Sequence, residues 1–272
     1  MKTPFQSRRM LKLIGLPCAA LLVVFAAAAR VQTSADAPPA ATNDVSQFPP
    51  LDKLPGKVPS HVWTGLGGVW ARDHARWKQS AATDAGAVVF LGDSITEGWS
   101  SLEGDFSKLK VANRGIGGDI TSGVLYRLYP DVLSLNPAAI VLLIGTNDVG
   151  DGADAEDVAA NTKLILQAIK NFNPKLKVIV CKIMPRAERN GGPVYSEKIQ
   201  KANALIEAYV KTEPNFTICD TWTIFVADDK GNPIADDFKA DKLHLNAAGY
   251  VVWKKALDPI IANLHLENAK SQ

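Results

Sequence analysis

The sequence predicts an α/β protein, a three-layer α/β/α sandwich with a five-stranded parallel sheet. After Gly86, five short apolar runs typical of buried strands recur, and helix-like segments separate them. Strands that alternate with helices indicate a parallel sheet covered by helices on both faces. The chain has 272 residues, which is enough for one large core of this kind.

The apolar pattern predicts each element in chain order. The strands are expected at residues 88–91, 109–112, 139–144, 178–183 and 216–219, and the helices at 95–102, 121–129, 155–171, 194–211 and 246–264. Pro130 should close the second of these helices, and Pro259 should kink or break the last. Both expectations follow from the missing N–H of proline and the clash of its ring with the preceding turn.

The N-terminal segment has the three parts of an export signal. Four basic residues between positions 2 and 12 precede an uncharged apolar run at residues 13–29, which ends in four alanines. The run contains Gly15 and Pro17 and is shorter than the roughly 20 apolar residues of a membrane-spanning helix. We therefore expect residues 1–29 to be a signal peptide that is cleaved on export to the periplasm or the cell exterior. Retention of this segment as a membrane anchor is the alternative.

A lead-in and a single folded domain are expected after the signal. Residues 30–60 are rich in Ala, Pro, Thr, Asp and Ser, which is typical of a loosely packed tether, and the domain is expected over residues 61–268. At its start Trp63, Trp70 and Trp77 are seven residues apart. This spacing favours one face of a helix packed on the domain, with an aromatic platform for a sugar as the alternative.

Charge and cysteine content exclude several classes of function. The net charge is only +2, and the export segment accounts for this excess, so no broad basic surface is expected and nucleic acid is excluded as a partner. Three Cys and four His, without an H-E-x-x-H pair, argue against a metal site, and we expect no cofactor. Cys181 and Cys219 are expected to be two buried free thiols, or a disulfide in an oxidising compartment.

The residues that directly follow the strands could carry chemistry, because ligands bind at the C-terminal strand ends of such sheets. Ser94 follows the first strand in a strand-to-helix turn, where its hydroxyl could act as a nucleophile. The alternative is a helix cap by Asp93 or Ser94, with Glu97 completing a capping box. The glycine-rich stretch at residues 115–118 follows the second strand and could present backbone N–H groups to a ligand, or it could be a plain tight turn.

The remaining candidates lie after the third strand and near the C-terminus. The carboxamide of Asn147 could donate to an oxyanion, or Asn147 could simply form a turn. Asp241 precedes His244 by three residues and could orient its imidazole toward a nucleophile. An isolated Asp and His at this spacing are, however, often a surface pair without a function. Together these sites place a nucleophile, N–H donors, an amide and an oriented base at one sheet edge, as acyl transfer requires.

These motifs resemble the four sequence blocks of the GDSL, or SGNH, hydrolases. The matching blocks are Gly92-Asp93-Ser94, Gly117-Gly118-Asp119, Gly145-Thr146-Asn147-Asp148 and Asp241-x-x-His244. The resemblance covers about residues 87–264. Within the family, the loop followed by Tyr126-Arg127-Leu128 is most similar to the type Ib platelet-activating-factor acetylhydrolase catalytic subunits and their bacterial relatives.

The resemblance implies a flavodoxin-like SGNH-hydrolase fold and a serine esterase without a cofactor. Ser94 matches the nucleophile, His244 the base and Asp241 the group that orients it, while Ser94, Gly118 and Asn147 match the oxyanion hole. It also implies a short acyl group, most simply acetyl, on a carbohydrate or lipid-like ester. A lysophospholipase or thioesterase with the same triad, and a non-catalytic carbohydrate- or envelope-binding module, are the alternatives.

The loops expected to select the alcohol contain no sequence motif that indicates which alcohol is bound. They cover residues 186–193 and 221–240, which are polar and contain Gly and Pro. Within them, Arg186 is expected to be exposed to solvent and Trp222 to pack on the domain, rather than to contact substrate. Contact with a membrane is expected only through an uncleaved N-terminal segment, and the sequence does not indicate an oligomeric state.

Overall fold

The computed structural model describes residues 69–187 and 195–265, and side chains from Arg72 onward. The expected signal peptide, the lead-in, Trp63, the side chain of Trp70 and both limits of the expected 61–268 domain lie outside the described residues. In the part of the chain that is described, no helix is both long enough and apolar enough to cross a membrane.

A five-stranded parallel sheet forms the middle layer, as the sequence predicts. Its strands are β1 (Val88–Gly92), β2 (Val111–Gly115), β3 (Ala139–Leu143), β4 (Lys177–Cys181) and β5 (Phe216–Cys219), in the order β2-β1-β3-β4-β5. All four strand pairings are parallel, and Val88 pairs with both Val111 and Ala139. The chain therefore reverses its direction of travel across the sheet between β1 and β3, which creates a crevice at their C-terminal ends.

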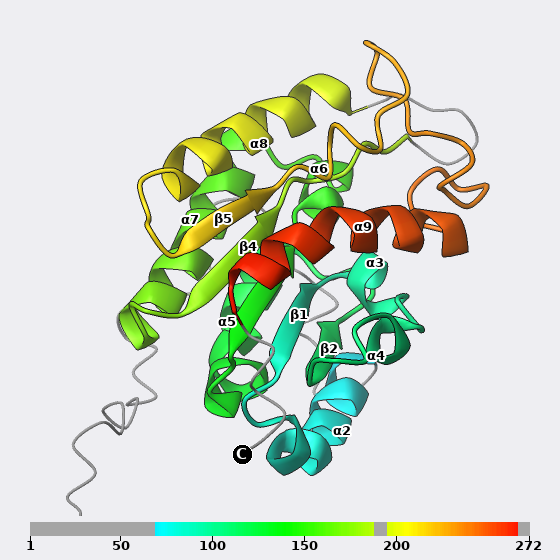
Figure 1. The fold of residues 1–272 in the computed structure, drawn as a ribbon. Coiled ribbons are helices and arrows are strands. Elements are labelled where there is room, and N and C mark those ends of the chain that lie inside the picture. The colour runs from blue at the N-terminus through cyan, green and yellow to red at the C-terminus, as the bar shows by residue number, and fades with distance from the viewer. Residues whose placement is uncertain (1–68, 188–194, 266–272) are drawn as a thin grey trace, which may run out of the picture. The chain divides into compact units, whose positions relative to one another are not determined.

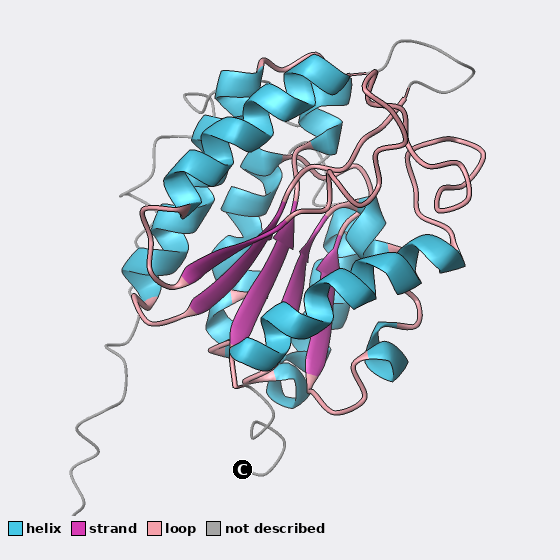
Figure 2. Cartoon of the chain, turned by 45° about the horizontal axis from the view of Figure 1, so that its top comes forward, coloured by secondary structure: helices cyan, strands magenta, loops and turns pink. Residues whose placement is uncertain are grey.

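Helices cover both faces of this sheet (Figures 1 and 2). They are α2 (Val69–Asp84), α3 (Ser94–Glu97), α4 (Leu102–Asp105), α5 (Thr121–Asp131), α6 (Thr146–Gly150), α7 (Ala155–Phe172), α8 (Ser196–Val210) and α9 (Ala247–Asn263), with a 3-10 turn, η3, at Leu133–Leu135. One core cluster joins the sheet to α5, α7 and α8, and a second joins it to α3, α4 and α9. Successive strand residues such as Val89 and Phe90 enter opposite clusters, because side chains alternate along a strand.

Three local expectations were wrong. The second strand begins at Val111 and not at residue 109, because Leu109 closes a turn by donating to the carbonyl of Phe106. It also continues to Gly115 through polar residues that an apolar pattern does not mark. The single helix expected at 95–102 is two short helices, since α3 ends at Glu97 with Gly98 as its C-cap. A side chain at Gly98 would lie 2.7 Å from the hydroxyl of Tyr250, so this position needs glycine.

Both prolines lie inside helices: α5 ends at Asp131, one residue after Pro130, and the break expected as one of two outcomes at Pro259 does not occur. Pro130 is in the last turn of α5, and α9 continues through Pro259 to Asn263.

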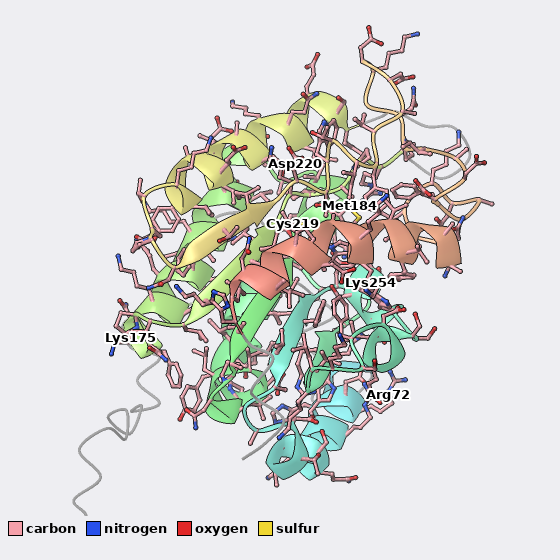
Figure 3. All side chains as sticks on the ribbon, viewed as in Figure 1. Arg72, Lys175, Met184, Cys219, Asp220 and Lys254 are labelled. Atoms are coloured by element: carbon pink, nitrogen blue, oxygen red, sulfur yellow. The ribbon has the colours of Figure 1, made fainter. Side chains whose placement is uncertain are left out.

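Trp77 packs in the core, and the two cysteines are free thiols. Trp77 on α2 is buried, so the packing interpretation is confirmed for this residue, and it is not available as a sugar platform. Cys181 on β4 is the register partner of Cys219 on β5, the one of the two that Figure 3 labels, and both are free and buried. Burial, together with the neighbouring Cys219, raises the pKa of the Cys181 thiol, which makes it a poor nucleophile.

A buried arginine joins the sheet to the loop after β2. Arg127 on α5 has no exposed side-chain surface, and its Nε donates to Asp119 Oδ2 at 2.7 Å. Its Nη2 donates to the carbonyls of Gly92 and Arg114, both at 2.9 Å, which are near the C-terminal ends of β1 and β2. Its guanidinium also lies 5.5 Å from the ring of Trp77. This arginine therefore pairs a buried carboxylate and holds two strand ends together.

We predict that Arg127→Met lowers the free energy of unfolding by about 3–5 kcal/mol, because Asp119 would remain as a buried charge without its partner. Urea denaturation monitored by circular dichroism measures this loss. The double variant Arg127→Met/Asp119→Asn should recover part of it, since the stranded charge is then removed. Equal stability of the single and double variants would contradict this explanation.

Candidate active site

The candidate residues meet at the C-terminal edge of the sheet, beside the crevice between β1 and β3. Ser94 is the first residue of α3, directly after β1, and Gly118 follows β2. Asn147 lies in α6, directly after β3, while Asp241 and His244 lie in the segment between β5 and α9. Parallel strands place these four chain segments at one edge because all of their C-terminal ends point the same way.

The hydroxyl of Ser94 is hydrogen-bonded to the base and is not used as a helix cap. Asp93 is the N-cap of α3, and its Oδ1 accepts the N–H of Ile95 at 2.9 Å. Ser94 Oγ lies 2.8 Å from His244 Nε2. Of the two expected capping residues, Asp93 therefore performs the capping, and Ser94 is left to face the imidazole.

Asp241 fixes the orientation of His244. Asp241 Oδ2 lies 2.7 Å from His244 Nδ1, and Oδ1 accepts the backbone N–H groups of Leu243 and His244, each at 3.0 Å. The compact turn requires Lys242 to adopt a left-handed conformation with φ of 53°. Partial burial opposes ionisation of Asp241, but these three hydrogen bonds outweigh it and lower its pKa to about 2. A carboxylate at Nδ1 leaves Nε2 as the nitrogen that can accept the Ser94 proton.

Gly118 and Asn147 lie in the segments that follow β2 and β3, at the same sheet edge as Ser94. Gly118 has a φ of +79°, a conformation that side chains disfavour. Asn147 Nδ2 donates one hydrogen to the carbonyl of Asp119 at 2.9 Å. An amide nitrogen carries two hydrogens, so the second is available for a ligand. The structure thus brings together all five residues that the sequence singles out.

Two buried acids, Asp93 and Asp148, lie next to the candidate residues at this edge of the sheet. Burial, with a smaller contribution from the charges of Asp119 and Asp148, raises the pKa of Asp93 to about 7. Burial likewise raises the pKa of Asp148 to about 6, although Asp148 accepts hydrogen bonds from both the hydroxyl and the backbone N–H of Thr121. These bonds tie α5 to α6, the helix that carries Asn147.

Tyr250 connects the two helices that flank the catalytic pair, and the sequence analysis missed it. Its buried hydroxyl donates to the carbonyl of Ile95 at 2.8 Å, which joins α9 to α3. Its ring lies 5.3 Å from that of Trp99. Because α9 begins three residues after His244, this bond ties the base to the nucleophile turn. A polar aromatic residue on the buried face of an apolar helix is the signal that would have identified it.

The expectation for Arg186 was wrong, and the one for Trp222 is confirmed. Arg186 is buried rather than exposed, because its Nη1 donates to the carbonyl of Thr146 at 2.8 Å and its guanidinium lies 5.1 Å from the ring of Tyr195. It therefore holds the loop after β4 against α6. Trp222 is half-buried and packs on the core cluster that includes α7 and α8.

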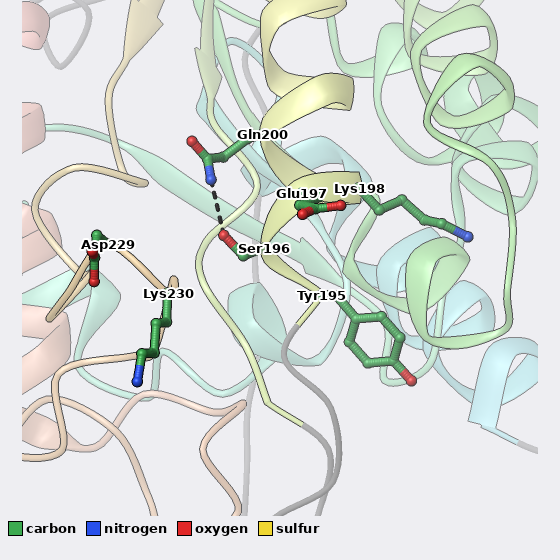
Figure 4. A pocket seen from close by; sticks show the side chains of 7 residues that line it. All are labelled: Tyr195, Ser196, Glu197, Lys198, Gln200, Asp229 and Lys230. Carbon is green, nitrogen blue, oxygen red and sulfur yellow. Dashed lines mark hydrogen bonds between the residues drawn. The ribbon is translucent and has the colours of Figure 1, made fainter.

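Two hollows lie apart from these residues. The larger, of about 430 Å³, is lined by Tyr195, Ser196, Glu197, Lys198, Gln200, Asp229 and Lys230 at the start of α8 (Figure 4). The smaller, of about 280 Å³, lies between α2 and α5. Neither of these two hollows is lined by Ser94 or His244. Within residues 69–187 and 195–265, no group of three His, Cys, Asp or Glu side chains is placed to hold a metal ion.

Comparison with known proteins identifies the family. Residues 90–252, which contain all five candidate site residues, match the model of the GDSL-like Lipase/Acylhydrolase family. The chain belongs to the GDSL-like lipase/acylhydrolase family. This GDSL acylhydrolase is therefore a carboxylic ester hydrolase, as the sequence blocks imply.

Relatives and solved structures agree with this assignment. The GDSL acylhydrolase is 32% identical over 221 residues to the bovine platelet-activating factor acetylhydrolase IB subunit alpha1, covering 78% of this chain and 91% of that one. It is 34% identical to the chicken alpha2 subunit, covering 78% and 93% of the two chains. A GDSL-like lipase from Bacteroides thetaiotaomicron has the same fold, with a TM-score of 0.61, 28% identity and coverage of 70% of this chain and 98% of that one.

We predict that Asp93→Asn stabilises the protein more at pH 8 than at pH 5. The folded pKa of Asp93 is about 7 against an ordinary value of 3.8, so the folded state binds the extra proton between these values. The contribution of Asp93 to the free energy of unfolding therefore falls as pH rises from about 4 to 7. Asparagine keeps the capping oxygen but carries no charge, and we expect a gain of about 1–3 kcal/mol at pH 8.

Denaturant unfolding at both pH values tests this, with Asp229→Asn as the control on an exposed loop. If Asp93→Asn changes the free energy of unfolding by the same amount at pH 5 and at pH 8, burial of the Asp93 charge is not the cause of that change.

Proposed function

We propose that this GDSL acylhydrolase is an exported serine esterase that removes short acyl groups, acetyl first among them, from a carbohydrate or lipid-like ester. The observation that carries the proposal is the continuous chain of hydrogen bonds from Ser94 Oγ through His244 to Asp241, with distances of 2.8 and 2.7 Å. This arrangement matches the geometry of a nucleophile, a base and an orienting carboxylate.

In the proposed cycle, His244 Nε2 takes the proton of Ser94 as Oγ attacks the ester carbonyl. The oxyanion that forms accepts hydrogen bonds from the backbone N–H groups of Ser94 and Gly118 and from the Asn147 amide. His244 then gives its proton to the leaving alcohol, and an acyl-enzyme remains on Ser94. His244 Nε2 then takes a proton from water as the water oxygen attacks the acyl carbonyl, and it returns that proton to Ser94 Oγ as the acyl bond breaks and the acid leaves.

The acyl and cellular parts of the proposal have separate support. The curated relatives are named as acetylhydrolases, which favours acetyl as the acyl group. The basic and apolar N-terminal segment supports export. An exported enzyme meets extracytoplasmic esters, and this is the reason to test carbohydrate acetates as well as lipid-like ones.

A series of para-nitrophenyl esters of increasing acyl length, run beside acetylated oligosaccharides, tests the substrate. Highest kcat/KM with acetate supports the proposal, whereas a maximum at long acyl chains would favour a lysophospholipase or thioesterase. Mass spectrometry of the protein recovered from cell fractions tests export, since a cleaved signal removes the first 29 or so residues.

We predict that Ser94→Ala and His244→Ala abolish hydrolysis of para-nitrophenyl acetate, while Asp241→Ala leaves a measurable remnant. The nucleophile and the base are both required for acylation, but water can partly orient the imidazole when the carboxylate is absent. Ser134→Ala, at an exposed serine, is the control. Wild-type activity in Ser94→Ala would overturn the esterase mechanism and support a different role for the domain.

We predict that Asn147→Ala lowers kcat by about 10²–10³ with little change in KM, because the amide binds charge that develops only in the transition state. Steady-state kinetics on para-nitrophenyl acetate measure the split, and Asn173→Ala is the control at a surface turn. A rise in KM at constant kcat would instead indicate that Asn147 binds the ground-state ester.

A further inference from the structure

A carboxylate lies beside the nucleophile and has no part in the proposed catalytic cycle. Glu97 is the last residue of α3, three positions after Ser94. A Cβ on Gly117 would lie 2.9 Å from Glu97 Oε2 and 3.8 Å from Ser94 Cβ. One point on the backbone next to Gly118 thus adjoins both the Glu97 carboxylate and the nucleophile.

Helix capping does not account for this carboxylate. Asp93 caps α3, and Ser94 Oγ is engaged by His244, so the capping box that the sequence offered as an alternative does not form. Among the described residues, no backbone N–H donates to the Glu97 side chain. Its position is therefore not explained by local helix stability.

The carboxylate is open to solvent and only loosely paired. The Glu97 side chain is 35% exposed, whereas those of Asp93 and Asp119 are enclosed. Arg72 on α2 (Figure 3) approaches Glu97 Oε1 only to 4.0 Å. The guanidinium of Arg72 is also bonded to Asp73, through Nε at 3.1 Å and Nη2 at 3.2 Å. Glu97 consequently presents negative charge at the rim of the candidate active site.

We propose that Glu97 determines which substrate charge the site prefers. The site then disfavours acetyl esters whose alcohol carries a negative charge and favours those whose alcohol carries a positive one. The inference rests on the proposed function, because a short acyl group leaves the alcohol as the part of the substrate that can carry charge near Glu97. Like charges repel and opposite charges attract across a partly exposed site, and Asp241 adds negative charge on the side of the base.

Three acetates of one phenol series that differ in the charge of the meta substituent test this inference: meta-acetoxyphenyl-trimethylammonium, meta-acetoxybenzamide and meta-acetoxybenzoate. With the wild-type protein we expect kcat/KM, divided by the rate constant of alkaline hydrolysis of each ester, to decrease in that order, with a spread of about three- to tenfold at low salt, and to converge as ionic strength rises. Glu97→Gln should reduce the differences in kcat/KM among the three acetates, and Glu97→Lys should reverse their order. Glu103→Gln, at an exposed glutamate on α4, removes the same charge and should retain the wild-type order.

The outcomes separate this inference from the proposed function. If the wild-type protein hydrolyses all three acetates at rates that do not depend on charge, the inference is overturned and the esterase stands. The same conclusion follows if Glu97→Gln changes all three rates by one common factor, since that is a structural effect. If no acetate is hydrolysed at all, the proposed acetylesterase function fails, and the inference fails with it.

Discussion

A buried guanidinium is the constraint on which the candidate active site depends. Arg127 binds the carbonyl of Gly92, directly before the nucleophile turn, and pairs with Asp119, whose own carbonyl accepts the Asn147 amide. The nucleophile segment and the amide donor are therefore both bonded to groups that Arg127 holds. Burying a charged pair is costly unless its geometry is good and its remaining hydrogens are used. The bonds from Nη2 to the two strand carbonyls supply part of that compensation, while Nη1 is buried without a hydrogen-bond partner. The contact with Trp77 places α2 beside the same network.

The acids of the site fall into two groups with different physical roles. Asp93, Asp119 and Asp148 are enclosed and act on the backbone or on Arg127, and burial raises the pKa of the first and the last. Asp241 is open enough to remain charged, and its hydrogen bonds lower its pKa. A preorganised site needs both kinds, because the enclosed acids fix the segments in place while the open one acts on the imidazole.

The parts of the structure that depend on local pattern could be predicted from the sequence, and the parts that depend on tertiary contacts could not. Strands buried on both faces appear as apolar runs, so the sheet and the residues after each strand were predictable. The end of β2 was not, because Asn113 and Arg114 are polar and find partners elsewhere in the fold. The burial of Arg186 and the bond from Tyr250 were missed for the same reason, since Thr146 and Ile95 are distant in sequence.

The separation of Ser94 and His244 by 150 positions has a consequence for biogenesis. Every strand of the sheet is complete before the base is synthesised, so a nascent chain can already contain its nucleophile and amide donor while it lacks a group to accept the proton. Tyr250 on α9 then joins this helix to the turn that carries Ser94. Under the proposed mechanism, ester cleavage therefore requires that the segment carrying His244 has joined the completed sheet.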